Sequence, residues 1–300
     1  ICHQALVNRI CWMQNKFQIS TKDKVLQKTP ITFDVSVWEF MWPLSVGAQL
    51  VFARPEGHKD PSYLSHLIKE HGITTLHFVP SMFRAMLYSS EWVTCNTIKR
   101  VICSGEELTR DIVELHYKQH KAELYNLYGP TEATIDVTSW HCKPSEVDLE
   151  IPIGKPINNT QLYILDKFKQ LVPKGTQGEL YIGGIGLAKG YLNNEVISKS
   201  SFIDNPFLKK GKLYRTGDIV KYRTDGNLIY MGRMDHQVKL RGFRIELGEI
   251  EHHINKVEEV RESIVCMYND VLNKQQLVAY VISTSVEEYS QRTKIQNYLY

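Results

Sequence analysis

The sequence has almost no excess of charge of either sign and no long apolar run. Lys and Arg number 36 against 33 Asp and Glu, so the formal net charge is only +3. No long basic block occurs, which argues against a surface for nucleic acid or an anionic membrane. The longest weakly polar run, Met41–Ala53, contains Pro43 and Gly47 and is shorter than the roughly 20 residues of a membrane span. We therefore expect neither nucleic acid nor a membrane as a partner.

The six cysteines form no C-x-x-C pair. This spacing excludes a zinc ribbon, and it does not resemble a disulfide framework, so a reducing, cytoplasmic location fits best. The chain begins with Ile1 rather than Met, and no signal-peptide pattern follows. We expect the chain to be part of something longer.

The sequence also lacks the usual glycine motifs for nucleotides. In the stretch Gly178–Gly190 the spacing from Gly184 is G-x-G-x-x-x-G, whereas a dinucleotide site has G-x-G-x-x-G. No helical pattern opens inside it, and no G-x-x-x-x-G-K-[ST] loop occurs in the sequence. Turns between antiparallel strands explain these glycines better.

Short apolar strands alternate with amphipathic helices in the first half. Leu64, Leu67 and Ile68, for example, share one face of a predicted helix that ends at Gly72. Such alternation predicts a parallel sheet, whose ligands bind beyond the carboxyl ends of its strands. The predicted strands are Ala48–Ala53 (buried), Thr74–Val79, Arg100–Cys103 and Glu123–Leu127, and the predicted helices are Pro61–His71, Ser81–Tyr88 and one capped by Thr109.

The pattern changes after about Pro152, where short strands are separated by Gly and Pro. Asp225-Gly226 between two apolar runs predicts a hairpin, and the stretch predicts a smaller antiparallel sheet or barrel. An α+β segment begins near Asp235. The predicted elements of these two parts are strands at Gln161–Leu165, Glu179–Ile182 and Ile219–Arg223, then a helix at Leu247–Lys256 and strands at Ser263–Tyr268 and Leu277–Ser283.

The stretch Tyr128-Gly129-Pro130-Thr131-Glu132 follows a predicted strand. Here Tyr128 could stack on a base, Thr131 could bond a phosphate, and Glu132 could hold Mg²⁺, which prefers one or two carboxylates plus phosphate oxygens. The alternative is a plain Gly-Pro turn with a capping Thr/Glu pair.

Three further motifs accompany it: Phe33–Glu39, Tyr214–Asp218 and Gly232–Glu251. In this order and at these separations, the motifs resemble the adenylation domains of nonribosomal peptide synthetases. That family belongs to the adenylate-forming superfamily, which also contains acyl-CoA synthetases and firefly luciferase. The resemblance covers almost the whole chain, and the last motif favours the peptide-synthetase branch.

The resemblance implies an α/β fold. Residues 1–234 would be the later part of a large adenylate-forming domain, with parallel sheets, helices and a smaller antiparallel β subdomain. Residues 235–300 would be an incomplete α+β C-terminal lid, with its hinge at Asp235. The family's phosphate loop is expected before Ile1 and its catalytic lysine after Tyr300, so we expect these 300 residues alone to be nearly inactive.

The resemblance also implies a reaction. An amino-acid carboxylate attacks the α-phosphate of ATP, and the phosphopantetheine thiol of a peptidyl carrier domain then takes the aminoacyl group. A condensation domain is expected in the same chain. By motif, Thr131 meets phosphate, Glu132 binds Mg²⁺, and Arg233 lies beside ribose and phosphate as the third catalytic residue. Asp218 would bind the ribose hydroxyls. The residues expected to surround the adenine are Gly105, Glu106, Asn126, Tyr128, Gly129 and Tyr230. The Arg241-Gly242 loop would approach the pantetheine arm, or it is simply a solvated basic loop.

A specificity pocket follows from the same resemblance, with Asp34 as the anchor for the α-ammonium group. Its polar members His77, Ser104 and Asp136 would be left unpaired by a purely aliphatic substrate, so we expect a hydroxyl amino acid. The set resembles the family's serine pattern, with threonine as the near rival. The expected lining is Asp34, Val35, Trp38, His77, Ile102, Ser104, Leu127, Ile135 and Asp136.

Three alternatives stay open. His77 could be a packed strand histidine, the chain could be an acyl- or aryl-acid CoA ligase of the same superfamily, or it could be a non-catalytic binding module. Asp34 argues against the ligase, because a fatty acid has no ammonium group to pair with it.

Overall fold

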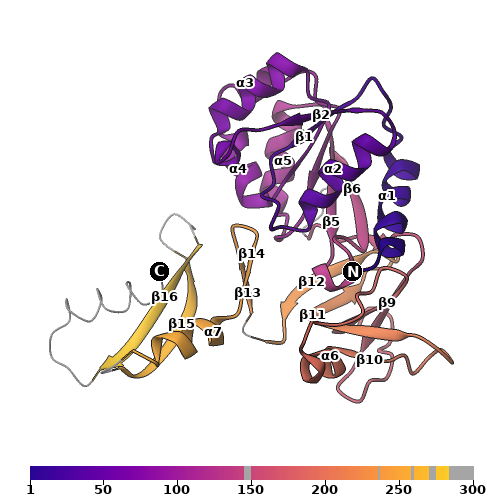
Figure 1. The fold of residues 1–300 in the computed structure, drawn as a ribbon, viewed down its shortest axis with the longest axis vertical. Coiled ribbons are helices and arrows are strands. Elements are labelled where there is room, and N and C mark those ends of the chain that lie inside the picture. The colour runs from indigo at the N-terminus through magenta and orange to yellow at the C-terminus, as the bar shows by residue number, and fades with distance from the viewer. Residues whose placement is uncertain (145–149, 236, 258–259, 270–274, 284–300) are drawn as a thin grey trace. The chain divides into compact units, whose positions relative to one another are not determined.

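The computed structural model describes residues 1–144, 150–235, 237–257, 260–269 and 275–283. The chain divides into two compact units, Ile1–Met234 and Asp235–Tyr300 (Figure 1). All six cysteines are free thiols. Within the described ranges, no helix is long and apolar enough to cross a membrane.

The first unit is built on a seven-stranded sheet of order β2-β1-β3-β4-β5-β6-β7. The first five strands of that order are parallel, as predicted, and the last two are antiparallel. The strands are β1 Lys24–Gln27, β2 Gln49–Phe52, β3 Thr75–Phe78, β4 Arg100–Cys103, β5 Glu123–Tyr128, β6 Thr138–Cys142 and β7 Lys155–Pro156. The prediction that the β2 region is a buried strand is wrong, because β2 lies at the sheet edge and exposes Gln49 and Phe52.

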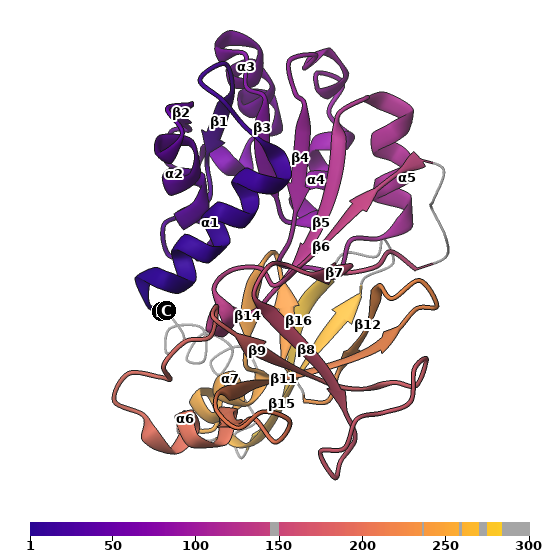
Figure 2. The same ribbon diagram turned by 90° about the vertical axis from the view of Figure 1, so that its right-hand side faces the viewer.

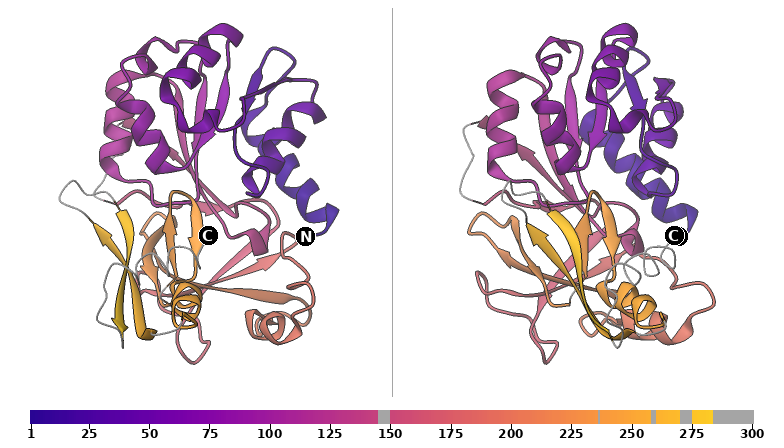
Figure 3. Two further views of the ribbon diagram at one scale, coloured as in Figure 1. Left: turned by 60° about the vertical axis from the view of Figure 1, so that its left-hand side comes forward. Right: turned by 90° about the vertical axis from the view of Figure 1, so that its left-hand side faces the viewer.

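Alternate residues of the central strands face two helix layers, as the twofold period of a strand requires. Val101, Cys103 and Leu124 pack in one apolar cluster with three helices: α3 Pro61–His71, α4 Pro80–Leu87 and α5 Arg110–Gln119. Ile102 and Leu127 pack in a second cluster, with α1 His3–Phe17 and α2 Val35–Ser45. Figure 3 shows the sheet between these two layers.

The second sheet of this unit is antiparallel, as predicted. Its order is β10-β11-β9-β8, and β12 pairs with β11 (Figure 2). Its core includes Tyr128, Ala133 and Val137, so it packs against the segment that leaves β5. The predicted turn at Asp225 and Gly226 joins β11 to β12. The elements are β8 Thr160–Leu165, β9 Gly178–Gly184, α6 Glu195–Ser201, β10 Phe202–Asp204, β11 Lys212–Tyr222 and β12 Leu228–Arg233, and short 3-10 turns lie at Gly57–Lys59 (η1), Trp92–Thr94 (η2) and Thr131–Ala133 (η3).

The described residues of the second unit form two antiparallel strand pairs and one helix. Arg241 and Gly242 form the two-residue turn of the first pair, and both have positive φ (52° and 81°), as a type I′ hairpin requires. The elements are β13 Val238–Leu240, β14 Phe243–Ile245, α7 Leu247–Ile254, β15 Val260–Asn269 and β16 Gln275–Ser283. Within the predicted lid, His236 of its motif and residues 258–259, 270–274 and 284–300 lie outside the described residues.

Candidate active site

Several predicted pocket residues meet at the carboxyl ends of β3, β4 and β5, on the face covered by α1 and α2. His77 is the register partner of Ile102, and Ile102 and Leu127 belong to the same apolar cluster as Trp38 of α2. The rings of Trp38 and His77 meet edge to face, with their centroids 6.1 Å apart. The parallel register therefore places residues from four elements side by side, as the sequence predicts.

The polar centre of this group is a pair formed by His77 and Ser104. His77 Nε2 lies 2.9 Å from Ser104 Oγ, and both side chains are buried. Burial lowers the pKa of His77 well below its usual range, and the positive charges of Lys28 and Arg9 lower it further. The imidazole is therefore neutral at pH 7. Its Nδ1 has no hydrogen-bond partner among the described residues.

Asp136 is not an unpaired polar group awaiting a substrate. Its Oδ2 accepts a hydrogen bond from Arg9 Nη2 at 2.6 Å, and both side chains are almost fully buried. The expectation that an aliphatic substrate leaves Asp136 and Ser104 unpaired is therefore wrong, because Arg9 and His77 already pair with them. Arg9 was not predicted as a site residue.

The sequence could have predicted the helix that carries Arg9, but not the contact of Arg9 with Asp136. The spacing of Leu6, Ile10, Met13 and Phe17 indicates a helix, and it could have revealed α1. No local pattern places Arg9 beside Asp136, because 127 positions separate them.

Asp34 immediately precedes α2 and borders a cavity of about 240 Å³. Thr131 Oγ1 donates to Asp34 Oδ2 at 2.7 Å, which joins the predicted ammonium anchor to the predicted phosphate residue. Burial raises the pKa of Asp34. The Thr131 hydrogen bond lowers it, and the negative charges of Asp136 and Glu132 raise it further. The cavity is lined by Ile1, Cys2, His3, Leu6, Asp34, Val37, Thr131, Thr134 and Ile135.

The other predicted pocket residues are not on the wall of this cavity. Val35, Trp38, Ile102 and Leu127 are packed in the cluster under α1 and α2. His77, Ser104 and Asp136 are held by the two polar pairs.

The loop Gly129–Asp136 is held in an unusual conformation. A Cβ on Gly129 would lie 2.5 Å from the Cα of Asp136, so only glycine allows this approach. Thr134 and Ile135 have φ of 66° and 74°, a region that β-branched residues rarely adopt. Thr134 Oγ1 donates to the Gly186 carbonyl at 2.6 Å, which helps to hold this conformation.

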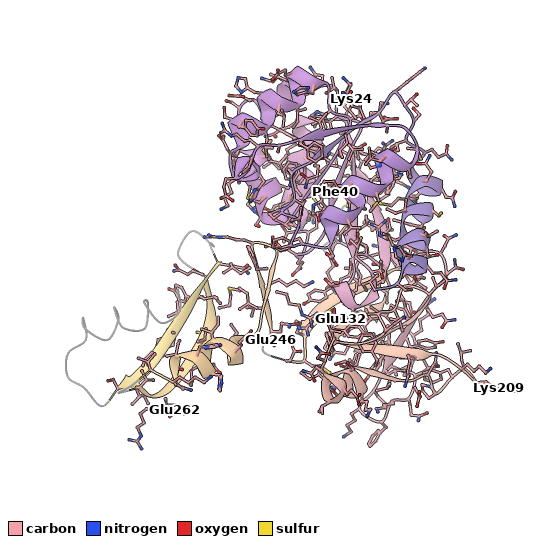
Figure 4. The ribbon with its side chains drawn as sticks, viewed as in Figure 1. Lys24, Phe40, Glu132, Lys209, Glu246 and Glu262 are labelled. Carbon is pink, nitrogen blue, oxygen red and sulfur yellow. The ribbon has the colours of Figure 1, made fainter. Side chains whose placement is uncertain are left out.

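Glu132 lies where this loop meets the second sheet (Figure 4). Tyr191 Oη donates to Glu132 Oε1 at 2.6 Å, and the carboxylate is mostly buried. Within the described ranges, no three His, Cys, Asp or Glu residues are grouped as a metal cage would require. A single carboxylate fits Mg²⁺ that arrives with substrate phosphates, but not Mg²⁺ held by protein alone.

A second polar group surrounds Asp218 on β11. Tyr128 Oη donates to Asp218 Oδ2, and Arg233 Nη1 donates to Asp218 Oδ1 at 2.6 Å. Arg233 Nη2 also donates to the Thr216 carbonyl at 3.0 Å. The rings of Tyr128 and Tyr230 have centroids 6.4 Å apart, so four predicted nucleotide residues are adjacent.

The remaining predicted residues have local structural contacts. Asn126 Nδ2 donates to the Pro152 carbonyl at 2.8 Å. Gly105 turns the chain after β4 with φ of 88°, and Glu106 Oε2 accepts from the Ser81 backbone N–H at 2.9 Å, at the start of α4. In the second unit, Asp235 Oδ1 accepts from the Gln237 backbone N–H at 3.2 Å.

Comparison with known proteins identifies the family of this chain. The model of the AMP-binding enzyme family matches residues 1–192, well over half of the chain. The chain belongs to the AMP-binding enzyme family. The α/β fold class is also confirmed, because the chain superposes with a TM-score of 0.87 on the Vibrio cholerae adenylation domain AlmE in complex with glycyl-adenosine-5'-phosphate. That structure is 27% identical and is matched over 99% of this chain and 57% of its own length.

The chain is also similar in sequence to parts of peptide synthetases. The chain is 48% identical over its full length to part of tyrocidine synthase 3 of Brevibacillus parabrevis, and it spans 5% of that protein. It is 44% identical over 94% of its length to enterobactin synthase component F of Escherichia coli O157:H7, and it spans 23% of that protein. The predicted membership among adenylation domains of nonribosomal peptide synthetases is thereby confirmed.

Proposed function

We propose that this chain activates L-serine with ATP, as the adenylating part of a peptide synthetase. The observation that carries the proposal is the pair of features on α2: the Asp34 carboxylate borders a cavity at the start of this helix, and Trp38 of the same helix contacts the neutral His77 of the His77–Ser104 pair. A carboxylate at this position selects an ammonium group, and His77, whose Nδ1 has no hydrogen-bond partner among the described residues, would select a small hydroxyl side chain.

The group around Asp218 would bind the nucleoside. The Asp218 carboxylate, which accepts a hydrogen bond from Arg233, is suited to the ribose hydroxyls. Tyr128 and Tyr230 offer ring faces to the adenine, and the turn at Gly105 and Glu106 would close its pocket. Asn126 and Gly129 would complete this site. The family membership and the aminoacyl-adenylate bound to AlmE support this role.

The reaction would be an in-line displacement at the α-phosphorus of ATP. A serine carboxylate oxygen forms the new P–O bond, the bond to the bridging oxygen breaks, and pyrophosphate leaves with its charge. Thr131 and Arg233 would stabilise the developing charge and align the phosphate. Glu132 would bind Mg²⁺, which supplies neutralisation of phosphate charge.

Discrimination between serine and threonine is the fine point of the proposal. One methyl group separates the two substrates, which is worth about 1–3 kcal/mol in a packed pocket. Trp38 and Ile102 are completely buried beside His77, so we expect a substrate side chain that reaches His77 to find little room for that methyl group. This packing favours serine.

The aminoacyl group would then pass to the phosphopantetheine thiol of a peptidyl carrier domain, with residues 235–300 as the lid and Asp235 as the hinge. The thiolate attacks the acyl carbon, and AMP leaves. One structural relative is an artificially fused adenylation–PCP di-domain from Klebsiella oxytoca, with a TM-score of 0.84 and 26% identity. It is matched over 97% of this chain and 54% of its own length, which supports a carrier partner. A condensation domain in the same protein is part of this proposal.

The test is ATP–pyrophosphate exchange by the full-length protein. It would be offered serine, threonine, alanine and a set of fatty and aryl acids in parallel. We expect serine to give the highest kcat/KM. Exchange driven only by another amino acid would refute the substrate, and exchange driven by an acid without an ammonium group would refute the amino-acid class.

A further inference from the structure

The ion pair between Arg9 and Asp136 has no role in the proposed function so far. Arg9 Nη2 lies 2.6 Å from Asp136 Oδ2, and the two side chains are only 1% and 2% exposed. A buried ion pair contributes little net stability, because desolvation offsets the attraction. Its presence beside a substrate pocket therefore suggests a role other than stability.

Arg9 is fixed from the α1 side. Its guanidinium carbon lies 4.9 Å from the centroid of the Trp12 ring, one turn along the helix. Its Nε and Nη1 have no hydrogen-bond partner among the described residues. Within this part of the chain, the guanidinium therefore donates its hydrogen bond to Asp136. Arg9 also influences His77 through its charge.

Asp136 is fixed from the loop side. It directly follows Thr134 and Ile135, which have positive φ, and its Cα packs against Gly129. Ile135 lines the cavity at Asp34, so a shift of Asp136 would also move a wall of that cavity.

The charge of Asp136 also bears on Asp34. The two carboxylates are close enough that the negative charge of Asp136 opposes ionisation of Asp34. Arg9 supplies positive charge at Asp136, so the ammonium group of a substrate has Asp34 as its partner. Without Arg9, Asp136 would be a second carboxylate that attracts a cation.

We propose that Arg9 is a positioning residue for substrate selection: it holds Asp136 and neutralises its charge, so that the pocket accepts a neutral hydroxyl side chain and rejects a cationic one. This inference rests on the proposed function, since it assumes that the pocket binds an amino acid.

The test compares L-serine with L-2,3-diaminopropionate in exchange assays of the full-length protein. The second compound replaces the serine hydroxyl with an ammonium group of similar size. Arg9→Met leaves Asp136 without this cation, so the ratio of kcat/KM for serine over diaminopropionate should fall by about tenfold or more. We expect this change in kcat/KM to come mostly from KM rather than from kcat, because Arg9 does not touch the reacting atoms.

Two further variants separate this role from a purely structural one. Arg9→Met combined with Asp136→Asn removes both charges and should restore the preference for serine over diaminopropionate. Arg9→Lys keeps the charge and should retain that preference, even if Arg9→Met fails to fold. Equal loss for both substrates in Arg9→Met, or no recovery of preference in the double variant, would overturn the proposal.

Assays of the wild-type protein distinguish failure of the proposed serine substrate from failure of the proposed role of Arg9. If it activates an amino acid other than serine, the proposed substrate fails, and the Arg9 variants are then compared on that amino acid and diaminopropionate. A wild type that already prefers diaminopropionate would overturn the Arg9 proposal directly.

Discussion

Asp34 is proposed to bind the ammonium group of the substrate, yet its surroundings oppose its charge. Burial and the negative charges of Asp136 and Glu132 raise its pKa, and only part of this is offset by the hydrogen bond from Thr131. A bound ammonium group would supply the missing opposite charge. On this proposal the site is most stable with an amino acid present, and we expect it to favour amino acids over acids that have no ammonium group.

This raised pKa predicts a pH dependence of substrate binding. Asp34 is charged above its pKa and neutral below it, so KM for serine should rise as the pH falls through a value above the 3.8 of an ordinary Asp. The measurement is exchange at saturating ATP between pH 4 and pH 8. Asp34→Asn should lose most activity and show no such titration; a KM for wild type that stays flat over this range would contradict the role of Asp34.

Tyr128 offers a prediction at the nucleotide side. Its hydroxyl donates to the buried Asp218, and Tyr128→Phe removes that bond but keeps the ring. Loss of a hydrogen bond to a buried charged group costs about 1.5–3 kcal/mol, so KM for ATP should rise by roughly tenfold or more. KM for serine should change little.

A matched control is Tyr163→Phe in the second sheet, where the ring stacks on Phe207 at 4.9 Å. This substitution also removes one hydroxyl and should leave both KM values unchanged. Equal effects of the two substitutions on KM for ATP would argue against a nucleotide role for Tyr128.

At the scale of elements, strands and helices with clear periodicity were predictable from the sequence. The helix α3 begins with Pro61, is capped by Asp60 and ends at Gly72 with φ of 65°, and each of these residues is a recognisable signal. β1 and α2 were not predicted. β1 has only four residues, and α2 contains Pro43, which normally argues against a helix.

The candidate site was predictable only where motifs carry it. The group around Asp218 and the residues near Asp34 were named from motifs, whereas Arg9 and Tyr191 were missed. Tyr191 is 59 positions from Glu132 and Arg9 is 127 from Asp136, so only the fold brings these partners together. Sequence patterns report local structure well, but they do not report such distant pairs.

The loop after β5 gives a prediction at this scale. Gly129→Ala would place a Cβ 2.5 Å from the Cα of Asp136, and backbone cannot move aside as a flexible side chain can. We expect a lower unfolding midpoint and loss of most exchange activity, since the loop carries Thr131 and Glu132. Both are measured on the same preparation, by thermal unfolding and by exchange.

Gly248→Ala in helix α7 is the matched control, because a Cβ there meets no atom of the described residues within 4 Å beyond its chain neighbours and its own helix backbone. Alanine in a helix should raise stability slightly, by about 0.5–1 kcal/mol. If Gly129→Ala behaves like Gly248→Ala, the close approach at Gly129 has no importance for the site.

At the scale of the whole molecule, the boundary between the two compact units coincides with the proposed hinge residue, Asp235. This boundary falls between Met234 and Asp235 in the sequence. Asp235→Pro would restrict φ of the hinge residue to about −65°. We expect serine-dependent exchange to change by less than about threefold, while the rate of transfer to a carrier domain falls by about tenfold or more.

Transfer is measured as loading of radiolabelled serine onto the phosphopantetheinylated carrier domain. Asp225→Ala, in the turn between β11 and β12, is a suitable control substitution, because it lies within the first unit. Equal loss of exchange and transfer in Asp235→Pro would argue against a hinge at this residue.

The central claim is that the site around Asp34, His77 and Ser104 selects serine for adenylation. It is tested most directly by ATP–pyrophosphate exchange with the full-length protein, comparing L-serine, L-threonine and L-alanine under identical conditions. We expect the highest kcat/KM for serine, by about tenfold over threonine, since one methyl group is worth about 1–3 kcal/mol. Exchange that is equal for the three amino acids, or highest for one without a hydroxyl group, would contradict it.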